Sequence, residues 1–431
     1  MDKASVKIIG FNPEGISAAA AASRISTGSG TALDAFAKSG DREKDVKLIG
    51  KVLSSGHNTV IEHMYVTAAF NDVSVLTEQL MIEHRLAAYT VKSRRYVDFS
   101  GAGFLVPEGL GKKRDQFTSH MEYLFGCYEK LLELGVPRED ARFVLPYCFR
   151  SNFIMSADAR EMLLVADSMT NGRLSVYPEV RHLGEMLLKQ LTELFPAADK
   201  ALGKRPRENE PLRGLESIAA PAQAEARVEL KSAPKDADRL LRDAMNFSAR
   251  GDMTLKQLVH DERPRELELL NYSFLIRDVS LAGVTHFTRH RIQSLIVPRP
   301  VEALKNGHYV LPETVRNNAE ALRLYTEAFE NNAKAAAAFM DDGQLIGYFA
   351  LAGNTVDILF SMNARELVHF LRLRTCARAQ WEIRACSNEM LGLLTEEYRD
   401  LFKYYGPSCA LLGYCPEGRL SCGKLRKAEE D

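Results

Sequence analysis

The sequence predicts an α+β protein made of two tandem copies of one domain, each a mostly antiparallel sheet packed against long helices, in a pseudo-twofold arrangement. Two observations support this prediction. Strand-like segments alternate with long amphipathic helical segments along the chain. The pattern of the first half also starts again after about 205 residues, and a repeat of this length indicates two domains and not a solenoid.

Composition indicates a globular protein with a large core, because 46% of its 431 residues are hydrophobic. A formal net charge of −1 argues against a general nucleic-acid binder, so any phosphate site must be local. No apolar run approaches the roughly 18 residues that cross a bilayer, and the first residues lack the pattern of a signal peptide. The seven cysteines are thinly spread, which favours reduced thiols, and we expect a cytoplasmic protein.

We expect the first copy to occupy residues 1–200. Period-two alternation marks its strands, and apolar residues at helical spacing mark its helices. The expected strands are residues 3–11, 57–74 and a run after Arg142; the expected helices are residues 15–25, 41–56, 75–93, 114–135 and one opened by Asp158.

Residues 201–227 are rich in proline, alanine and charge without sustained periodicity, and we interpret them as a linker. The second copy then occupies residues 228–431. Its residues 277–291 align without a gap on residues 71–85, at an offset of 206 that follows from 277 − 71. Two shorter matches, YVLPE to FLVPE and SMNARE to SADARE, lie at an offset of 205, from 309 − 104 and 361 − 156.

The second copy contains an unusual cluster of cations between Ser361 and Arg384. Read as one helix from Asn363 onward, this stretch has an apolar stripe in which Arg374 and Arg378 also fall. A guanidinium is tolerated in such a place only beside an anion or several acceptors, and a structural ion pair would explain one such residue. Four arginines and a histidine lie within fourteen positions, and this unbalanced charge favours a phosphate ligand.

The two copies keep different members of one basic set. The first copy has lost the cation that the second keeps in its arginine-rich helix, and the second has lost a serine and an arginine that the first keeps. This complementary pattern predicts one site assembled from both copies. The pairs at equivalent positions, first copy before second, are Ser93 and Arg299, Arg142 and Gly347, and Met169 and Arg374.

These motifs resemble the flavin-dependent thymidylate synthases. The hallmark of that family is Arg-His-Arg followed seven residues later by Ser and shortly by Arg, and it stands here as EHRLAAYTVKSRR, Glu83–Arg95, with Glu83 replacing the leading arginine. The second copy has Arg-His-Arg intact at 289–291 but lacks the serine. Ser361–Arg384 is similar to a second signature of the family. The resemblance covers nearly the whole chain outside the linker.

The resemblance implies a set of site residues, of which Arg374 and Ser93 are the candidate catalytic ones. We prefer Ser93 as a binding hydroxyl, because no activating histidine lies beside it in sequence. Either arginine-histidine set, from the first or the second copy, could face the flavin. The implied deoxyuridylate-binding residues are Ser93, Arg95, Arg142 and Arg374, and the implied flavin-binding residues are Glu62 (matched by Glu268), His84, Arg85, Arg289, His290, Arg291, Asn363, Arg365, His369 and Arg378.

The implied reaction is the reductive methylation of dUMP to dTMP, with FAD as cofactor and with NADPH and methylene-tetrahydrofolate as co-substrates. Arginine suits this chemistry because its planar fork binds phosphate with two charge-assisted hydrogen bonds. The hydride must come from a cofactor. Since the family forms homotetramers of single-copy subunits, the resemblance also implies a homodimer of double-length chains, with neither nucleic acid nor membrane as partner.

Two alternatives remain open at this point. Glu83, and Leu80 or His286 where the family has glutamine, leave room for another pyrimidine nucleotide as substrate. A non-catalytic flavin- or nucleotide-binding relative is the second alternative. We expect no metal site, because Cys409, Cys415 and Cys422 are one ligand short of a closed zinc site and favour free thiols in a tail.

Overall fold

The structure is a computed structural model that describes residues 3–202 and 209–425. It forms two compact units. The first unit contains Met1–Ile218 and Lys334–Ala350, and the second unit contains Ala219–Ala333 and Leu351–Asp431. Residues 203–208 of the expected linker lie outside the described residues. Among the residues described, no helix combines the length and hydrophobicity that crossing a membrane requires.

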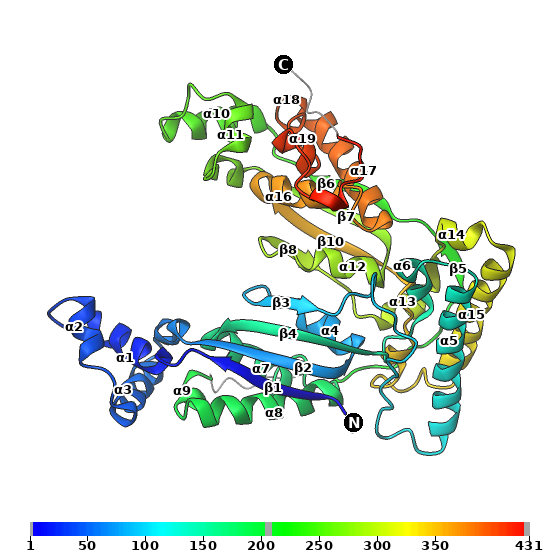
Figure 1. Ribbon diagram of the computed structural model, residues 1–431, viewed down its shortest axis with the longest axis horizontal. Helices are drawn as coiled ribbons and strands as arrows, with labels where there is room; N and C mark the ends of the chain where they lie inside the picture. Colours follow the sequence, from blue (N-terminus) through cyan, green and yellow to red (C-terminus); the bar gives the residue numbers. More distant parts are fainter. Residues whose placement is uncertain (1–2, 203–208, 426–431) are drawn as a thin grey trace. The chain divides into compact units, whose positions relative to one another are not determined.

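The first unit is built on a four-stranded sheet in the order β1-β2-β4-β3, and every neighbouring pair is antiparallel. Side chains alternate along β2 and β4 between buried and accessible positions, so one face of the sheet carries the core. Helices α7 and α8 cover that face (Figure 1). The strands are β1 (Ser5–Phe11), β2 (Tyr65–Ser74), β3 (Ala88–Val91) and β4 (Arg150–Asp158).

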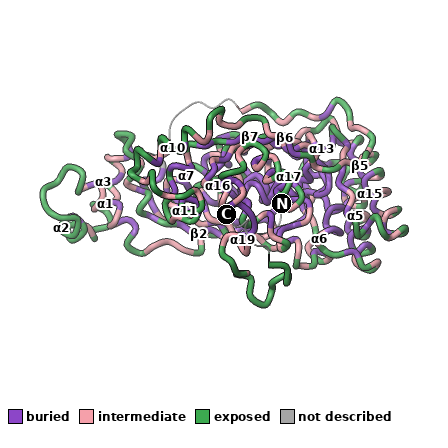
Figure 2. The backbone as a smooth tube through the Cα atoms, turned by 90° about the horizontal axis from the view of Figure 1, so that it is seen from above, coloured by how far each residue is buried: buried purple, intermediate pink, exposed green. Residues whose placement is uncertain are grey.

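The remaining elements of the first unit are helical. The 20-residue helix α5 is long and amphipathic, as its sequence predicts, and α2 lies largely exposed (Figure 2). The helices are α1 (Gly15–Ile25), α2 (Ala32–Ala37), α3 (Arg42–Ser54), α4 (Val75–Met81), α5 (Arg114–Glu133), α6 (Arg138–Ala141), α7 (Ala159–Thr170), α8 (Pro178–Leu194) and α9 (Ala198–Ala201), and the 3-10 helices are η1 (Asn58–His63), η2 (Gly111–Lys113), η3 (Arg142–Val144) and η5 (Ile346–Phe349).

The second unit repeats this sheet. Its four strands lie in the order β6-β7-β10-β8, again antiparallel throughout. Phe287 of α12 packs against Phe360 of β10 and stacks on Phe370 of α16. A short parallel pair, β5 with β9, lies beside it, so part of the expected linker is a strand. The strands are β5 (Ala222–Ala224), β6 (Arg227–Ser232), β7 (Asn271–Ser280), β8 (Gln293–Ile296), β9 (His308–Val310) and β10 (Thr355–Asn363).

Helices of the second unit include α15, whose last residues belong to the first unit. The helices are α10 (Ala237–Phe247), α11 (Leu255–His260), α12 (Leu281–Phe287), α13 (Val301–Asn306), α14 (Glu313–Arg316), α15 (Ala319–Ala337), α16 (Ala364–Arg374), α17 (Trp381–Glu397), α18 (Arg399–Phe402) and α19 (Ser408–Leu412), and the 3-10 helices are η4 (Arg265–Leu269) and η6 (Gly418–Leu420).

The duplication extends to buried details. Ser74 caps α4, and its N–H and hydroxyl donate to the Glu179 carboxylate, with the N–H bond at 2.8 Å. Ser280 caps α12 and donates in the same way to Glu382, with the N–H bond at 2.7 Å. Both glutamates stand in the first turn of a helix, where the helix dipole favours negative charge. The α+β fold in two antiparallel copies is therefore confirmed.

One segment of the second sequence copy belongs to the first compact unit. Residues 334–350 follow from the second copy in sequence but pack in the first unit. Phe349 lies edge-on to Phe117 of α5, with ring centroids 5.5 Å apart, and the Tyr147 N–H donates to the Ala350 carbonyl at 2.8 Å. The core of the first unit therefore contains side chains from both copies.

Two expected helices are shorter than predicted. The expected helix 75–93 ends at Met81, because Ala88–Val91 pairs with β4 as strand β3. The expected helix 75–93 would contain His84, and this placement is wrong, because His84 lies in a turn after α4 just as His290 lies in a turn after α12. The helix read as continuous from Asn363 to Arg384 ends at Arg374, and Arg378 lies in the turn before α17.

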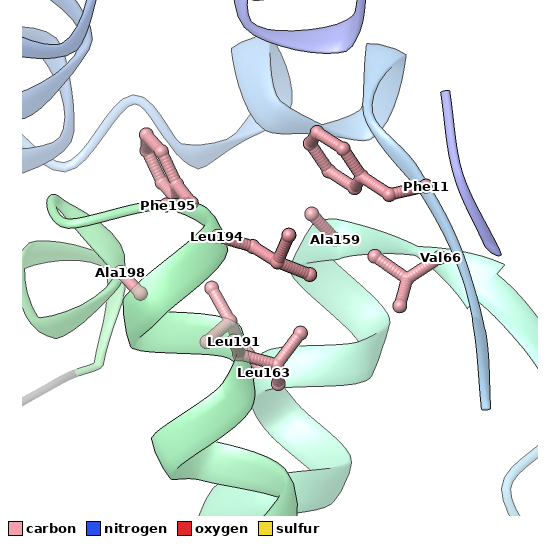
Figure 3. Close-up of a pocket in the computed structure, with 8 residues that line it drawn as sticks. All are labelled: Phe11, Val66, Ala159, Leu163, Leu191, Leu194, Phe195 and Ala198. Carbon is pink, nitrogen blue, oxygen red and sulfur yellow. The ribbon is translucent and has the colours of Figure 1, made fainter. Parts of the chain in front are cut away.

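The apolar pocket beneath the first sheet is a packing gap. It is lined by strand residues such as Phe11 and Val66 and by Leu163 and Leu191 of α7 and α8, all pointing into it (Figure 3). Its volume is about 10 Å³, and none of its lining residues carries a polar side chain. Because a cavity this small holds at most about one water, it is part of the core and not a ligand site.

Candidate active site

The start of α16 is fixed by two polar contacts. The Asn363 side chain caps the helix, accepting from the Glu366 N–H at 2.8 Å, and Arg365 forms an ion pair with Glu268. The first copy has the same arrangement, because Asp158 caps α7 and Arg160 pairs with Glu62. In both copies the glutamate that we expect near the flavin is therefore held by an arginine at the start of this helix.

His290 connects the end of α12 to α16. The imidazole is buried, its Nδ1 lies 3.1 Å from Oε1 of Glu366, and its Nε2 accepts from Nε of Arg374 at 3.1 Å. A terminal nitrogen of Arg374 also donates to the His286 carbonyl at 3.2 Å. Arg374 is half-buried among acceptors, which is the condition that a guanidinium on an apolar stripe requires.

The electrostatics of this group follow from burial. Burial, with the charges of Arg374 and His369 beside it, lowers the pKa of His290 to about 2, so the imidazole is neutral. Burial raises the pKa of Glu366 to about 7, although His369 and Arg365 act in the opposite direction. The group therefore contains a neutral imidazole between a carboxyl and a fixed cation.

A metal ion is the other ligand that these residues suggest. One nitrogen each of His290 and His369 and one oxygen of Glu366 lie within 4.8 Å of one another. Both ring nitrogens of His290, however, are already engaged, one of them with the Arg374 cation. Because a guanidinium at that position repels a metal ion, the residues form a hydrogen-bonded group better suited to orienting Arg374.

The first copy has the same histidine and glutamate without the arginine. His84 Nδ1 lies 3.8 Å from Glu161, and burial and Arg173 lower the pKa of His84 to about 4. The buried Nε2 of His84 has no hydrogen-bond partner among the described residues. Met169, at the position of Arg374, is fully buried, and a Cβ added at Gly184 would lie 2.5 Å from its Cβ. The former cation position is now part of the α7 and α8 core.

Glu83 forms an ion pair that the sequence pattern did not reveal. It forms an ion pair with Arg173 at 3.2 Å, and burial raises the pKa of Glu83. Arg173 stands at the position of Arg378, since 378 − 173 gives the repeat offset of 205, and Glu83 stands at the position of Arg289. The first copy thus has an ion pair at the two positions where the second copy has two arginines.

The predicted nucleotide residues of the first copy meet around Glu139. Arg95 forms an ion pair with the Glu139 carboxylate, and Nε of Arg142 donates to the Glu139 carbonyl at 2.9 Å. The Arg95 N–H points to the Ser93 hydroxyl at 3.4 Å. Ser93, Arg95 and Arg142 therefore lie in one place in the first unit, with Arg142 buried and Arg95 partly accessible.

The remaining sequence candidates are accessible. Arg85, Arg289, Arg291 and His369 are exposed, and Arg299 is exposed and pairs with Glu302 at 3.4 Å. Cys409, Cys415 and Cys422 carry free thiols. A hollow of about 240 Å³ in the first unit, between Pro107 and Tyr348, is lined by none of the predicted site residues.

The chain matches a known family in both halves. The family described as thymidylate synthase complementing protein matches residues 7–197 and again residues 217–398. The chain belongs to this family. The resemblance that we inferred from the sequence motifs is confirmed, and so is the presence of two copies.

The chain is similar in sequence to flavin-dependent thymidylate synthases. A flavin-dependent thymidylate synthase of Nitratidesulfovibrio vulgaris is 34% identical over 175 residues, which are 37% of this chain and 70% of the relative. Another, of Geobacter sulfurreducens, is 37% identical over 169 residues, which are 38% of this chain and 72% of the relative. A solved UMP/dUMP methylase of Streptomyces cacaoi, bound with 5-Br dUMP, is 22% identical with a TM-score of 0.40, covering 46% of this chain and 94% of that one.

Sequence reasoning about this thymidylate synthase family member missed three charged residues at the site. Glu366, Glu139 and Arg173 contact predicted residues but were not among the candidates. A signal existed for Glu366, because SADARE and SMNARE repeat the glutamate in both copies. No comparable signal marked Glu139 or Arg173, whose partners lie 44 and 90 residues away, by 139 − 95 and 173 − 83.

Proposed function

We propose that this protein is a flavin-dependent thymidylate synthase that reductively methylates dUMP to dTMP, with methylene-tetrahydrofolate as carbon donor and NADPH as reductant. Family membership over both halves supports the reaction class. The single observation that supports a site composed of both copies is the complementary retention of basic residues in the two copies. Each copy alone lacks part of the set, and together they supply it once.

In this proposal the first copy binds the nucleotide phosphate. Arg95 and Arg142 lie around Glu139, and Ser93 adds a hydroxyl next to Arg95. Guanidinium groups bind a dianionic phosphate through charge-assisted hydrogen bonds, each contributing about 1.5–3 kcal/mol. The Glu139 carboxylate holds Arg95 in the same way and would exchange with the phosphate when the nucleotide binds.

The second copy supplies Arg374 and the residues for the flavin. Arg374 would donate to a uracil carbonyl, where negative charge develops as carbon 5 becomes a nucleophile. The exposed Arg289 and Arg291 stand on either side of buried His290 in the sequence, and their two guanidinium groups would bind the pyrophosphate of FAD. The flavin supplies the hydride that no side chain can provide. The ion pair of Glu83 with Arg173 makes the equivalent place in the first copy unsuitable for the same anion.

The activity is tested with the purified chain. We expect a yellow protein that NADPH bleaches and that converts dUMP to dTMP only when methylene-tetrahydrofolate is present. A yellow protein that forms no dTMP from dUMP would indicate that the substrate is another pyrimidine nucleotide. A colourless protein that cannot be loaded with FAD would contradict it and favour a non-catalytic relative.

The composite site is tested by two variants and a control. Arg142→Ala and Arg374→Ala should each weaken dUMP binding by about 10–100-fold, because each removes a charge-assisted contact of about 1.5–3 kcal/mol. Arg299→Ala, at the lost serine position of the second copy, should bind dUMP as the unchanged protein does. Equal losses in all three variants, measured by calorimetry, would contradict the division of labour between the copies.

The same variants address assembly. We propose a homodimer of double-length chains, with each site built from the two copies within one chain. Co-expression of the Arg142→Ala and Arg374→Ala chains should then yield no active site, because every chain carries a defect. Recovery of about a quarter or more of the activity would place the two halves of the site on different chains, as statistical pairing of subunits requires.

A further inference from the structure

The hydrogen bond from Arg374 shows which tautomer His290 adopts. An arginine Nε–H can only donate, so His290 Nε2 must accept from it at 3.1 Å. A neutral imidazole that accepts at Nε2 carries its proton on Nδ1. Nδ1, which carries that proton, lies 3.1 Å from Oε1 of Glu366. A single directed chain therefore runs from Arg374 through His290 to Glu366.

The first copy provides a natural comparison. It keeps the histidine and the glutamate as His84 and Glu161, but Met169 replaces the arginine. There the distance from Nδ1 to the carboxylate is 3.8 Å instead of 3.1 Å, and the buried Nε2 has no hydrogen-bond partner among the described residues. The close contact between histidine and glutamate accompanies the arginine, which indicates that the three residues act together.

We propose that Glu366 is a positioning residue: by holding His290 in the Nδ1–H tautomer, it makes Nε2 an acceptor that fixes Arg374 in the orientation that meets the nucleotide. The statement that Arg374 meets the nucleotide rests on the proposed function. The geometry of the hydrogen-bonded group does not, because it follows from the contacts of the three side chains.

Burial supports this role. Glu366 is 8% exposed and His290 4% exposed, so water competes little for either group. Burial keeps His290 neutral by lowering its pKa to about 2. A protonated Glu366 still has a carbonyl oxygen that accepts from Nδ1–H, so the orientation survives in both protonation states of the carboxyl.

The tautomer can be observed directly. Histidine-selective ¹⁵N labelling of the unchanged full-length protein, with His290→Gln to assign the resonance, should place the proton of His290 on Nδ1. In Glu366→Gln, whose amide oxygen can still accept, the same tautomer should persist. In Glu366→Leu, where Nδ1–H has no acceptor and only the Arg374 contact still favours this tautomer, the Nδ1–H population should fall. An Nε2–H tautomer or a charged imidazole in the unchanged protein would overturn the proposal.

Nucleotide binding provides the second measurement. Glu366→Leu should weaken dUMP binding by up to the about 10–100-fold expected of Arg374→Ala, because Arg374 then loses the acceptor that orients it, while Glu366→Gln should stay within about threefold. Glu161→Leu, the matched change in the first copy, should cause a smaller loss because no arginine depends on it. Unchanged dUMP binding in Glu366→Leu would contradict the proposal. If the unchanged protein binds no dUMP, the proposed function fails, and the tautomer measurement still decides the positioning role.

Discussion

At the scale of single residues, this molecule shows how a duplicated position can change its chemistry. Met169 and Arg374 occupy equivalent places, yet one is core and the other a half-buried cation with imidazole and carbonyl acceptors. Glu83 and Arg289 also occupy equivalent places but differ in charge, and Glu83 forms an ion pair with Arg173 within its own unit. In each case one copy has replaced a potential ligand contact by an internal one.

The raised pKa of Glu366 gives a pH prediction. The pKa is about 7 in the folded protein and 4.5 ordinarily, so the folded state binds the proton more tightly. This contribution to the free energy of unfolding is fully present below pH 4.5 and is lost as the pH rises through 7, with a ceiling of about 3 kcal/mol. Glu366→Gln should therefore lose less stability than the unchanged protein between pH 5 and pH 8.

Urea unfolding midpoints at the two pH values measure this difference. Glu396→Gln on α17, an exposed carboxylate, is a control whose pH dependence should match that of the unchanged protein. If the unchanged protein and Glu366→Gln lose the same stability over this interval, the carboxyl does not titrate near pH 7.

At the scale of elements, the most regular feature is the serine cap that donates to a buried glutamate. The α4 cap contacts Glu179 of α8, and the α12 cap contacts Glu382 of α17. Each glutamate therefore joins the strand end and following helix to a helix about 100 residues later, satisfying two buried donors. The arrangement fixes where α4 and α12 begin.

We predict that Glu382→Ala destabilises the protein by about 2–5 kcal/mol, because it leaves the Ser280 N–H and hydroxyl buried without their acceptor. Glu396→Ala on the same helix is exposed and should change the free energy of unfolding by less than about 0.5 kcal/mol. Chemical unfolding of both variants tests this. Similar small effects in the two variants would mean that Ser280 finds another acceptor.

At the scale of the whole molecule, the compact units do not coincide with the sequence copies. The segment 334–350, from the second copy, completes the core of the first unit through Phe339 and Phe349 against Phe117. Deleting the second copy would therefore remove part of the first unit. This gives a physical reason for expecting the two copies to be retained together in one chain.

We predict that Phe349→Ala destabilises the first unit by about 3–5 kcal/mol, the usual cost of emptying a buried phenylalanine site. Hydrogen exchange should then accelerate in α5, although Phe349 belongs to the other copy in sequence. The control is Phe329→Ala, a buried residue of α15 within the second unit, which should leave the exchange of α5 unchanged. Faster exchange in α5 with both variants would mean that the units unfold together.

The sequence by itself determined the α+β class, the tandem copies, the family and most helices, because periodicity, capping residues and motif spacing are local properties of the chain. It correctly placed the start of α16 next to Asn363, the cap residue, because the Asn363 side chain accepts from an N–H only three residues away. The assignment of roles to Ser93, Arg95, Arg142 and Arg374 stays a prediction, and the Arg142→Ala and Arg374→Ala variants test two of these roles.

Only the tertiary structure decided what depends on contacts between distant segments. Strand pairing with β4 converted part of an expected helix into β3 and placed His84 in a turn, which no local propensity indicated. The partners of Arg95, Glu83 and His290 became visible only in three dimensions, because 44, 90 and 76 residues separate each from its partner, by 139 − 95, 173 − 83 and 366 − 290. The packing of residues 334–350 in the first unit has the same cause: burial of aromatic side chains is non-directional and does not follow the order of the chain.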